Sequence, residues 1–328
     1  MSSSLPTDAA LLGALFAARG GRVSRQELAR AAQISPETLE SRFAPYLEAG
    51  YPIQFHPEGG VSLLDPPDIW CAEEIVGRCP RSVELNAPVW NPLLLAETAS
   101  TNDVARDQGR RGGASGFVVA AARQTRGRGR LGRVWESPRD CGLYVSLLLR
   151  PDLALADAGQ LTLLASVAGA SATEKLTGIR PRIKWPNDLF IGDRKLGGIL
   201  IETEPRGSRI GFAVIGIGLN VNHGPEDFSP EVRDLATSLR IATGTAYRRA
   251  DLLVALLHAF DHQLRVPFSE TRDAWVASSL TMGQRVSLTT SRGVRHGQAL
   301  GLDDSGALLL RTDSGEVEAI TAGDMRAV

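Results

Sequence analysis

Residues 123–138 read RQTRGRGRLGRVWESP, and the spacing of Gly127, Gly129 and Gly132 in this stretch matches the glycine fingerprint G-x-G-x-x-G of dinucleotide-binding folds. That fingerprint requires a helix that begins at the glycine loop and crosses over to a parallel strand. Here Pro138 and a cluster of turn residues follow, and the next apolar run begins too soon for a crossover helix. The stretch therefore predicts a loop between two strands rather than the start of a doubly wound sheet.

The same loop concentrates positive charge in Arg126, Arg128, Arg130 and Arg133. Like charges repel one another and glycines remove side chains that could pack, so we expect the loop to stay open and poorly ordered until an anion completes it. Guanidinium groups bind phosphate and carboxylate through paired hydrogen bonds. Trp135 offers a flat apolar face that suits a purine ring or the protein core. On charge pattern alone, a solvated basic turn is the alternative.

The 328 residues are 43% hydrophobic and 22% charged, which is typical of a globular protein long enough for two or three domains. The formal net charge of -1 provides no global field that would attract nucleic acid, so any anion site is local. Cys71, Cys79 and Cys141 form no C-x-x-C pair, which favours structural thiols in a reducing compartment. We find no signal peptide and no apolar run of about 18 residues, and we expect a cytoplasmic protein without a membrane span.

The pattern along the chain predicts three domains and an α+β fold class. The first domain reads as three helices and a hairpin, the order of a winged helix-turn-helix, and Ser24 and Glu27 form a capping box at its second helix. The second mixes long apolar strands with helices and includes a hairpin that turns at Gly192 and Asp193. The third has short strands separated by glycine turns, which indicates a small β-barrel. The expected domains are residues 1–67, 68–278 and 279–328.

Three other segments carry polar residues at the ends of elements. KWPND places Lys184 at the end of a strand, where a rigid ammonium could clamp an anion in a cleft or simply reach solvent. GIGLNVN, which starts at Gly216, ends another strand with small residues, consistent with close approach of a ligand or with a bulge. ASTND reads as a capping box of Ser100 with Asp103, and the first-turn amides of that helix could also receive a polar ligand.

Together these motifs resemble those of the biotin protein ligases. The resemblance rests on the arginine loop combined with KWPND, and it extends over nearly the whole chain, including KLGGIL from Lys195 and GIGLN from Gly216. With a winged helix in front, the domain order is similar to that of the two-function bacterial form, the biotin operon repressors. The resemblance implies a mixed α/β catalytic domain similar to class II synthetases, followed by an SH3-like C-terminal barrel.

The resemblance also implies a reaction in two steps. The carboxylate of biotin attacks the α-phosphate of ATP to give biotinyl-adenylate and pyrophosphate, and a lysine amine of a carrier domain then attacks the mixed anhydride. Fixed cations would stabilise the charge that develops in the first transition state. Mg²⁺ is expected on the leaving pyrophosphate, and the sequence predicts no metal cage of protein ligands.

The matching residues take their expected roles from the same resemblance. Lys184, Arg128 and Arg130 would be catalytic, with the arginines on the carboxylate and α-phosphate and Lys184 bridging acyl and phosphoryl oxygens. The expected biotin-binding residues are Ser100, Thr101, Asn102, Gln124, Arg128, Gly129, Arg130, Lys184 and Gly198. The expected nucleotide-binding residues are Arg130, Arg133, Trp135, Asn187 and Asn220, with Trp135 over the adenine.

The expected partner is the biotin carboxyl carrier protein of acetyl-CoA carboxylase, and the resemblance allows a homodimer. Operator DNA is less favoured, because residues 1–67 carry five arginines against seven acids. Glu37 and Glu40 lie early in the helix expected to read DNA, and Pro45 is expected to interrupt the later part of that helix.

Two other functions remain as alternatives. A lipoate or octanoate ligase or transferase would share the catalytic fold, and a repressor that responds to biotin would use mainly the first domain. The histidine pair of HAFDH, His258 and His262, imitates a zinc-binding helix but lacks the glutamate that follows the first histidine in such proteases. We expect this helix to serve packing.

Overall fold

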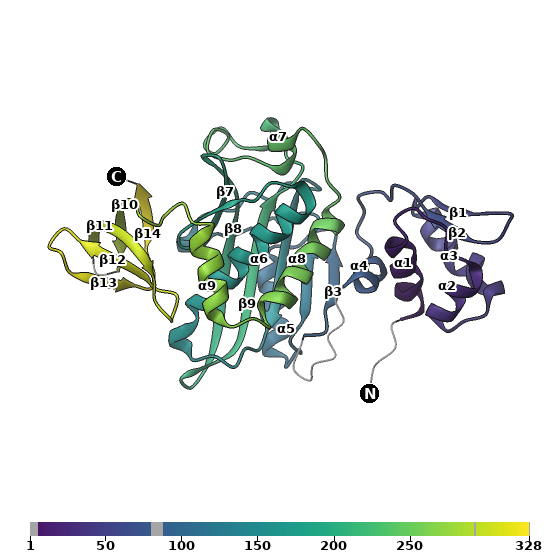
Figure 1. Ribbon diagram of the computed structural model, residues 1–328, viewed down its shortest axis with the longest axis horizontal. Helices are drawn as coiled ribbons and strands as arrows, with labels where there is room; N and C mark the ends of the chain where they lie inside the picture. Colours follow the sequence, from purple (N-terminus) through teal and green to yellow (C-terminus); the bar gives the residue numbers. More distant parts are fainter. Residues whose placement is uncertain (1–5, 80–87, 292, 328) are drawn as a thin grey trace.

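The computed structural model describes residues 6–79, 88–291 and 293–327. Its helices and strands lie in three groups along the long axis of the molecule, and the largest group, built on a wide sheet, is in the middle (Figure 1). The fold is therefore a mixed α+β fold with a central sheet and a separate C-terminal β group.

The N-terminal group has three helices followed by a two-stranded hairpin, which is the order expected from the sequence. Its elements are α1 (Thr7–Ala17), α2 (Arg25–Ala32), the 3-10 helix η1 (Pro36–Thr38), α3 (Leu39–Glu48), β1 (Ile53–Phe55) and β2 (Val61–Leu63). The predicted capping box is confirmed, because the Ser24 hydroxyl accepts from the Glu27 amide and the Glu27 carboxylate accepts from the Ser24 amide. The expected interruption at Pro45 is wrong. This proline removes one amide donor, but α3 continues through it to Glu48.

Helix α4 (Ala72–Arg78) packs against α1, although it lies beyond residue 67. Two glycines allow the two backbones to approach closely: a Cβ on Gly77 would lie 2.1 Å from the Ala9 carbonyl oxygen, and one on Gly13 would lie 2.4 Å from that of Gly77. Cys71, just before α4, belongs to the buried N-terminal cluster. The core of the N-terminal group therefore extends past residue 67.

The central sheet has seven strands in the order β3-β4-β5-β9-β8-β7-β6. The strands are β3 (Asn91–Leu95), β4 (Phe117–Ala121), β5 (Gly142–Leu149), β6 (Arg182–Lys184), β7 (Asp188–Ile191), β8 (Arg194–Arg206) and β9 (Arg209–Asn220). Strands β3 and β4 are parallel, and every other pair is antiparallel. The predicted turn at Gly192 is confirmed: it joins β7 to β8 with a φ of 57°, a value that glycine adopts readily.

Helices cover both faces of this sheet. One face packs against α6 (Gly159–Thr177), α8 (Arg249–Gln263) and α9 (Phe268–Ala277) (Figure 1), and the other against α5 (Thr101–Arg110). Neighbouring residues of β5 show the alternation: Leu147 belongs to the cluster on the α6 face, whereas Leu148 belongs to the cluster with Ala105 of α5. The short elements are η2 (Arg130–Gly132), η3 (Leu155–Asp157), η4 (Pro225–Asp227) and α7 (Leu239–Thr243).

The C-terminal group is a five-stranded antiparallel sheet in the order β13-β12-β11-β10-β14. Its strands are β10 (Arg285–Thr290), β11 (Gly293–Leu302), β12 (Leu308–Thr312), β13 (Val317–Ile320) and β14 (Asp324–Ala327). Leu288 and Leu310 lie in the same buried cluster as the α6 face of the central sheet, so the two groups share one core. Among the described residues β13 and β14 are not paired with each other, and closure into an SH3-like barrel stays a prediction.

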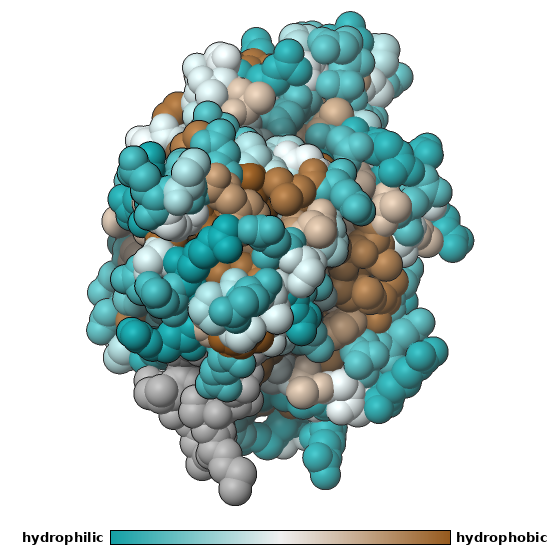
Figure 2. Space-filling view, turned by 90° about the vertical axis from the view of Figure 1, so that its right-hand side faces the viewer, coloured by the Kyte–Doolittle hydropathy of each residue, from teal (hydrophilic) through white to brown (hydrophobic). Residues whose placement is uncertain are grey.

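The surface seen from the N-terminal end is mainly hydrophilic, with hydrophobic side chains gathered mostly at one side of the view (Figure 2). Within the described part of the chain, no helix combines the length and the apolar character that crossing a bilayer requires. Cys71, Cys79 and Cys141 are free thiols.

Candidate functional site

The arginine loop folds as a narrow hairpin that ends in the short 3-10 helix η2. The amide of Gly129 donates to the carbonyl of Arg133 at 2.7 Å, and the amide of Trp135 donates to that of Gly127 at 3.0 Å. The chain passes from this hairpin directly into β5, without a crossover helix. The prediction that this loop is not a dinucleotide-binding fingerprint is therefore confirmed.

Protein carboxylates already pair with two of the loop arginines. Arg128 donates two hydrogen bonds to Asp103, of 2.9 and 2.7 Å, and these bonds hold the pKa of Asp103 below its ordinary value. Arg133 pairs with Asp324 at 2.5 Å. The expectation that only an anionic ligand completes the loop is wrong for these two arginines, because acidic side chains from distant parts of the chain offset their charge.

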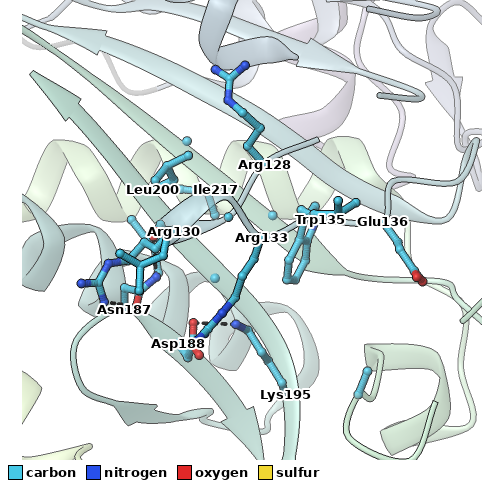
Figure 3. A pocket seen from close by; sticks show the side chains of 18 of the residues that line it. Arg128, Arg130, Arg133, Trp135, Glu136, Asn187, Asp188, Lys195, Leu200 and Ile217 are labelled. Carbon is cyan, nitrogen blue, oxygen red and sulfur yellow. Dashed lines mark hydrogen bonds and ion pairs between the residues drawn. The ribbon is translucent and has the colours of Figure 1, made fainter. Parts of the chain in front are cut away.

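Arg130 joins the loop to two other parts of the site. Its guanidinium donates to Oδ1 of Asn187 in the KWPND segment (Figure 3) and to the carbonyl of Gly323 in the C-terminal group, both at 3.2 Å. Burial lowers the pKa of Arg130 from its ordinary value. The C-terminal group thus contributes to the position of a residue that was expected to be catalytic.

A cavity of about 620 Å³ lies beneath this loop. Its wall comes from the arginine loop, the KWPND segment, strands β8 and β9 and the start of β14 (Figure 3). Twelve of the expected site residues line it: Ser100, Asn102, Gln124, Arg128, Gly129, Arg130, Arg133, Trp135, Lys184, Asn187, Gly198 and Asn220. The fold thus brings together residues from five separate segments of the chain.

Thr101 is the expected site residue that does not line the cavity. Its amide and its hydroxyl both donate to Oε1 of Gln124, at 2.8 and 3.1 Å, and its hydroxyl oxygen lies 2.7 Å from that of Ser146. The predicted capping box of Ser100 and Asp103 is wrong, because the Ser100 side chain makes no capping hydrogen bond. Gln124 satisfies the first amide of α5 instead, and Asp103 is engaged by Arg128.

Two glycines of GIGLN explain how other site residues reach the sheet. A Cβ on Gly216 would lie 2.2 Å from Oδ1 of Asn102, and one on Gly218 would lie 2.5 Å from Nε1 of Trp135. Real Cβ atoms essentially never come so close, so each glycine leaves room for the side chain above it. The groups that approach these two glycines are protein side chains, and the close approach of a ligand stays a prediction.

Lys195 is a site residue to which the sequence reading gave no role. It lines the cavity, with its ammonium 2.7 Å from Asp188 and 5.7 Å from the centre of the Trp135 ring. The predicted turn at Gly192 could have revealed it, because that hairpin returns Lys195 beside KWPND. The chain has three lysines, and two of them line this cavity, so compact ammonium groups are concentrated at the site.

Lys184 differs from the other cations of the cavity. Its ammonium lies 5.6 Å from the centre of the Phe190 ring and makes no hydrogen bond or ion pair with any residue that the structure describes. The other lysine and the three arginines that line the cavity all have polar partners. Lys184 is therefore the cation whose hydrogen-bond donors are available to an anion.

Residues 228–236 form an apolar part of the wall that the sequence reading missed. Phe228, Val232, Leu235 and Ala236 line the cavity, and the Ser229 amide next to Phe228 donates to the Glu136 carboxylate at 3.1 Å. The segment has no regular apolar period, so its only signal was the presence of apolar residues in an otherwise polar connection.

His223 gives the fold a pH dependence that can be measured. It is 1% exposed and stacks on Phe228, and burial lowers its pKa from 6.5 to about 4. Between those values the unfolded chain binds a proton that the folded chain does not, so this contribution to stability is present above about pH 6.5 and is lost as the pH falls toward about 4.

We expect this single histidine to lower the free energy of unfolding by about 2 kcal/mol when the pH falls from about 7 to about 5. Urea unfolding of the wild type and of His223→Gln at both pH values isolates the effect. The variant should lose less stability than the wild type between the two conditions, and equal losses would show that His223 titrates normally in the folded chain.

Helix α8 packs against α6 through its apolar side chains, as expected of a packing helix. The His258 ring donates from Nε2 to the carbonyl of Arg78 at 2.8 Å, and His262 is exposed. The described residues contain no group of three or more His, Cys, Asp or Glu side chains that could hold a metal ion.

Comparison with known proteins gives matches over most of the chain. Residues 95–220 match the biotin/lipoate A/B protein ligase family, and residues 281–325 match the biotin protein ligase C terminal domain. The bifunctional ligase/repressor BirA of Bacillus subtilis is 34% identical over 95% of this chain and 96% of its own length. The biotin--[acetyl-CoA-carboxylase] ligase of Paracoccus denitrificans is 35% identical over 68% of this chain and 95% of its own.

Among solved structures, the biotin protein ligase of Aquifex aeolicus in complex with biotin and ATP superposes with a TM-score of 0.63, at 31% identity over 73% of this chain and 99% of that one. These matches, together with the central sheet and the C-terminal β group, define the class of ligases that act on biotin or lipoate. Within that class, the chain belongs to the biotin protein ligase family.

Proposed function

We propose that the chain, a biotin protein ligase, makes biotinyl-adenylate from biotin and ATP and transfers the biotin to a lysine of a biotin carboxyl carrier protein. The observation that carries this proposal is the ammonium of Lys184, which has no hydrogen-bond or ion-pair partner among the described residues. It lies in a cavity lined by nearly all the residues expected to bind biotin and nucleotide. The relatives named as ligases of biotin to acetyl-CoA carboxylase support the choice of acceptor.

In the first step, the carboxylate of biotin attacks the α-phosphate, and negative charge accumulates on the acyl and phosphoryl oxygens. Lys184 would bridge these oxygens, and Arg130, which also lines the cavity, would bind the carboxylate and α-phosphate. Because Asn187 and Gly323 hold Arg130 in place, little reorganisation is needed when the charge develops.

The two substrates would occupy different parts of the cavity. Ser100, Asn102 and Gln124 would hydrogen-bond the head group of biotin, with Thr101 holding the Gln124 amide, and Gly198 and Gly129 would let backbone approach the ligand. Trp135 and the apolar segment 228–236 would enclose the adenine. Arg133, Asn187 and Asn220 would lie on the nucleotide side of the cavity.

Mg²⁺ is expected to be bound by the phosphate oxygens of ATP, where it offsets the charge of the leaving pyrophosphate. The carboxylates of the cavity already have partners: Asp188 pairs with Lys195, Asp324 pairs with Arg133, and Glu136 accepts a backbone amide hydrogen. These residues fit a metal held by the nucleotide rather than by a protein cage.

The choice of acid separates this proposal from the lipoate and octanoate alternative. We expect pyrophosphate release from ATP and Mg²⁺ to depend on biotin and to be at least about tenfold slower with lipoate or octanoate at equal concentration, because Ser100, Asn102 and Gln124 would be left without the ureido partner. Pyrophosphate production followed with each acid measures this. A faster rate with lipoate would assign the site to the other branch of the class.

A second candidate function is repression of transcription. It is favoured by the relatives named ligase/repressor, whose similarity includes most of the chain, and by the helix order of residues 6–63, which we assign to a winged helix-turn-helix. Charge opposes it, since Arg22, Arg25 and Arg42 each pair with an acid of the same group. A shift assay with the upstream DNA of the gene, with and without biotin and ATP, tests this function; binding that salt does not weaken would argue against a phosphate-contacting reader.

The domain boundaries, the oligomeric state and the location of the protein stay predictions. We retain three domains, expected at residues 1–67, 68–278 and 279–328, with the packing of the first continuing into α4. We also retain a catalytic domain similar to class II synthetases and an SH3-like closure of the C-terminal strands. A homodimer and a cytoplasmic location also stay predictions of the family resemblance.

A further inference from the structure

A cluster of two acidic side chains, two arginines and one amide joins the arginine loop to α5 and β8. We define it as Asn102, Asp103, Arg106, Arg128 and Glu202. Asp103 accepts two hydrogen bonds from Arg128 and one of 2.5 Å from Arg106. Glu202 accepts from Asn102 at 2.7 Å and from Arg106 at 3.2 Å, and lies 3.8 Å from Arg128. Two acids thus share two arginines and one amide.

The direction of Arg128 does not fit a residue that acts on substrate. Its guanidinium points away from Asp188 and Lys195, which lie at the opposite side of the cavity (Figure 3). Both terminal nitrogens of its fork are engaged by Asp103. A fork satisfied by a carboxylate is not free to bind a second one in the same geometry. Asp103, Arg106 and Glu202 do not line the cavity themselves.

The geometry points to Asp103, assisted by Glu202, as a positioning residue that anchors the arginine loop through Arg128, and we propose that Arg128 acts on the reaction through this anchor rather than by touching the substrate. This inference rests on the proposed ligase function for its kinetic effect, but not for its effect on the loop. It assigns to Arg128 a role different from that of Arg130, which lies two residues further along the same loop.

The ion pair of Arg128 with Asp103 is expected to stabilise the position of the loop. The Arg128 and Asp103 side chains are 36% and 31% exposed, and a bidentate, partly buried pair is more stabilising than an exposed single contact. The pair joins the loop to the first turn of α5, from which Ser100 and Asn102 enter the cavity. Loss of the pair should therefore loosen the loop and weaken binding of biotin, with less effect on the chemical step.

A charge swap tests the proposal. Arg128→Asp and Asp103→Arg, alone and combined, are compared with the wild type in biotin-dependent pyrophosphate release and in hydrogen exchange of the amides of residues 123–138. We expect each single variant to raise KM for biotin about tenfold with kcat changed less than about threefold, and to speed exchange in the loop. The double variant should restore only part of both, because the arginine placed at position 103 would also face Arg106. Asp103→Asn, a milder change, should shift both in the same direction.

The controls separate this result from other causes. Arg110 and Glu204 form an ion pair between the same helix and the same strand, away from the loop, and reversing that pair should leave KM for biotin and loop exchange unchanged. If kcat falls while KM for biotin is kept, or if loop exchange in Arg128→Asp stays at the wild-type rate, Arg128 does not act through the anchor and the proposal is overturned. If the wild type releases no pyrophosphate, the ligase proposal fails, while loop exchange still decides whether the anchor exists.

Discussion

Lys184→Ala is expected to slow biotin-dependent pyrophosphate release by about 100-fold or more. An aligned charge that stabilises a developing anion in a water-poor site typically contributes that much to the rate. Lys184 is the cavity cation without a polar partner among the described residues, so its removal breaks no side-chain hydrogen bond or ion pair with them. Steady-state pyrophosphate production at saturating ATP and biotin measures the effect.

Lys175→Ala provides the matched control, because this exposed lysine lies in the last turn of α6, outside the cavity. It should keep the wild-type rate. Lys184→Arg should recover only part of the activity, since the larger guanidinium places its charge differently. A Lys184→Ala enzyme within about threefold of the wild-type kcat would remove Lys184 from the transition state, whatever its effect on KM.

Glu74→Ala is expected to destabilise the chain by about 3–5 kcal/mol, because it removes one partner from a buried ionic cluster. The Glu74 side chain is fully buried. It accepts hydrogen bonds from the Tyr51 hydroxyl at 2.6 Å, from Arg78 at 2.5 Å and from Arg248 at 2.9 and 3.1 Å. The substitution would leave these donors without that partner in the interior.

Urea unfolding, followed by circular dichroism at constant pH, measures this loss. The neighbouring exposed Glu73→Ala should change stability by less than about 1 kcal/mol, since it removes no buried charge. Because Tyr51 belongs to the N-terminal group and Arg248 lies at the start of α8, the Glu74 variant should also separate the unfolding of the two groups into distinct transitions. A loss below about 1 kcal/mol for Glu74→Ala would show that water replaces the buried pairs.

Local chemistry in the sequence predicted the parts of the fold that depend on neighbours in the chain. The turn at Gly192, the capping box at Ser24 and the absence of a helix after the arginine loop follow from residues within a few positions of each other. The cavity residues were expected from the resemblance to the biotin protein ligases, and for Lys184 and the GIGLN segment the position at a strand end pointed the same way.

The partners of those residues could not be read in the same way. Asp324 pairs with Arg133, although 191 positions separate them in the chain. Gln124 rather than Ser100 accepts the hydrogen bond of the first backbone amide of α5. Such contacts depend on which elements pack together, and no local pattern encodes that choice. For this reason the sequence predicted a loop that stays open until an anionic ligand binds, whereas Asp103 and Asp324 already pair with two of its arginines.

The intact mass of an acceptor tests the central claim most directly. An unmodified biotin-carrier domain is incubated with the chain, biotin, ATP and Mg²⁺ and weighed by mass spectrometry, with Lys184→Ala in parallel. We predict that the domain gains the mass of one biotinyl group, that a domain lacking its acceptor lysine gains none, and that the variant gives little product in the same time. An unchanged carrier mass, with neither adenylate nor pyrophosphate formed by the wild type, would contradict the ligase account.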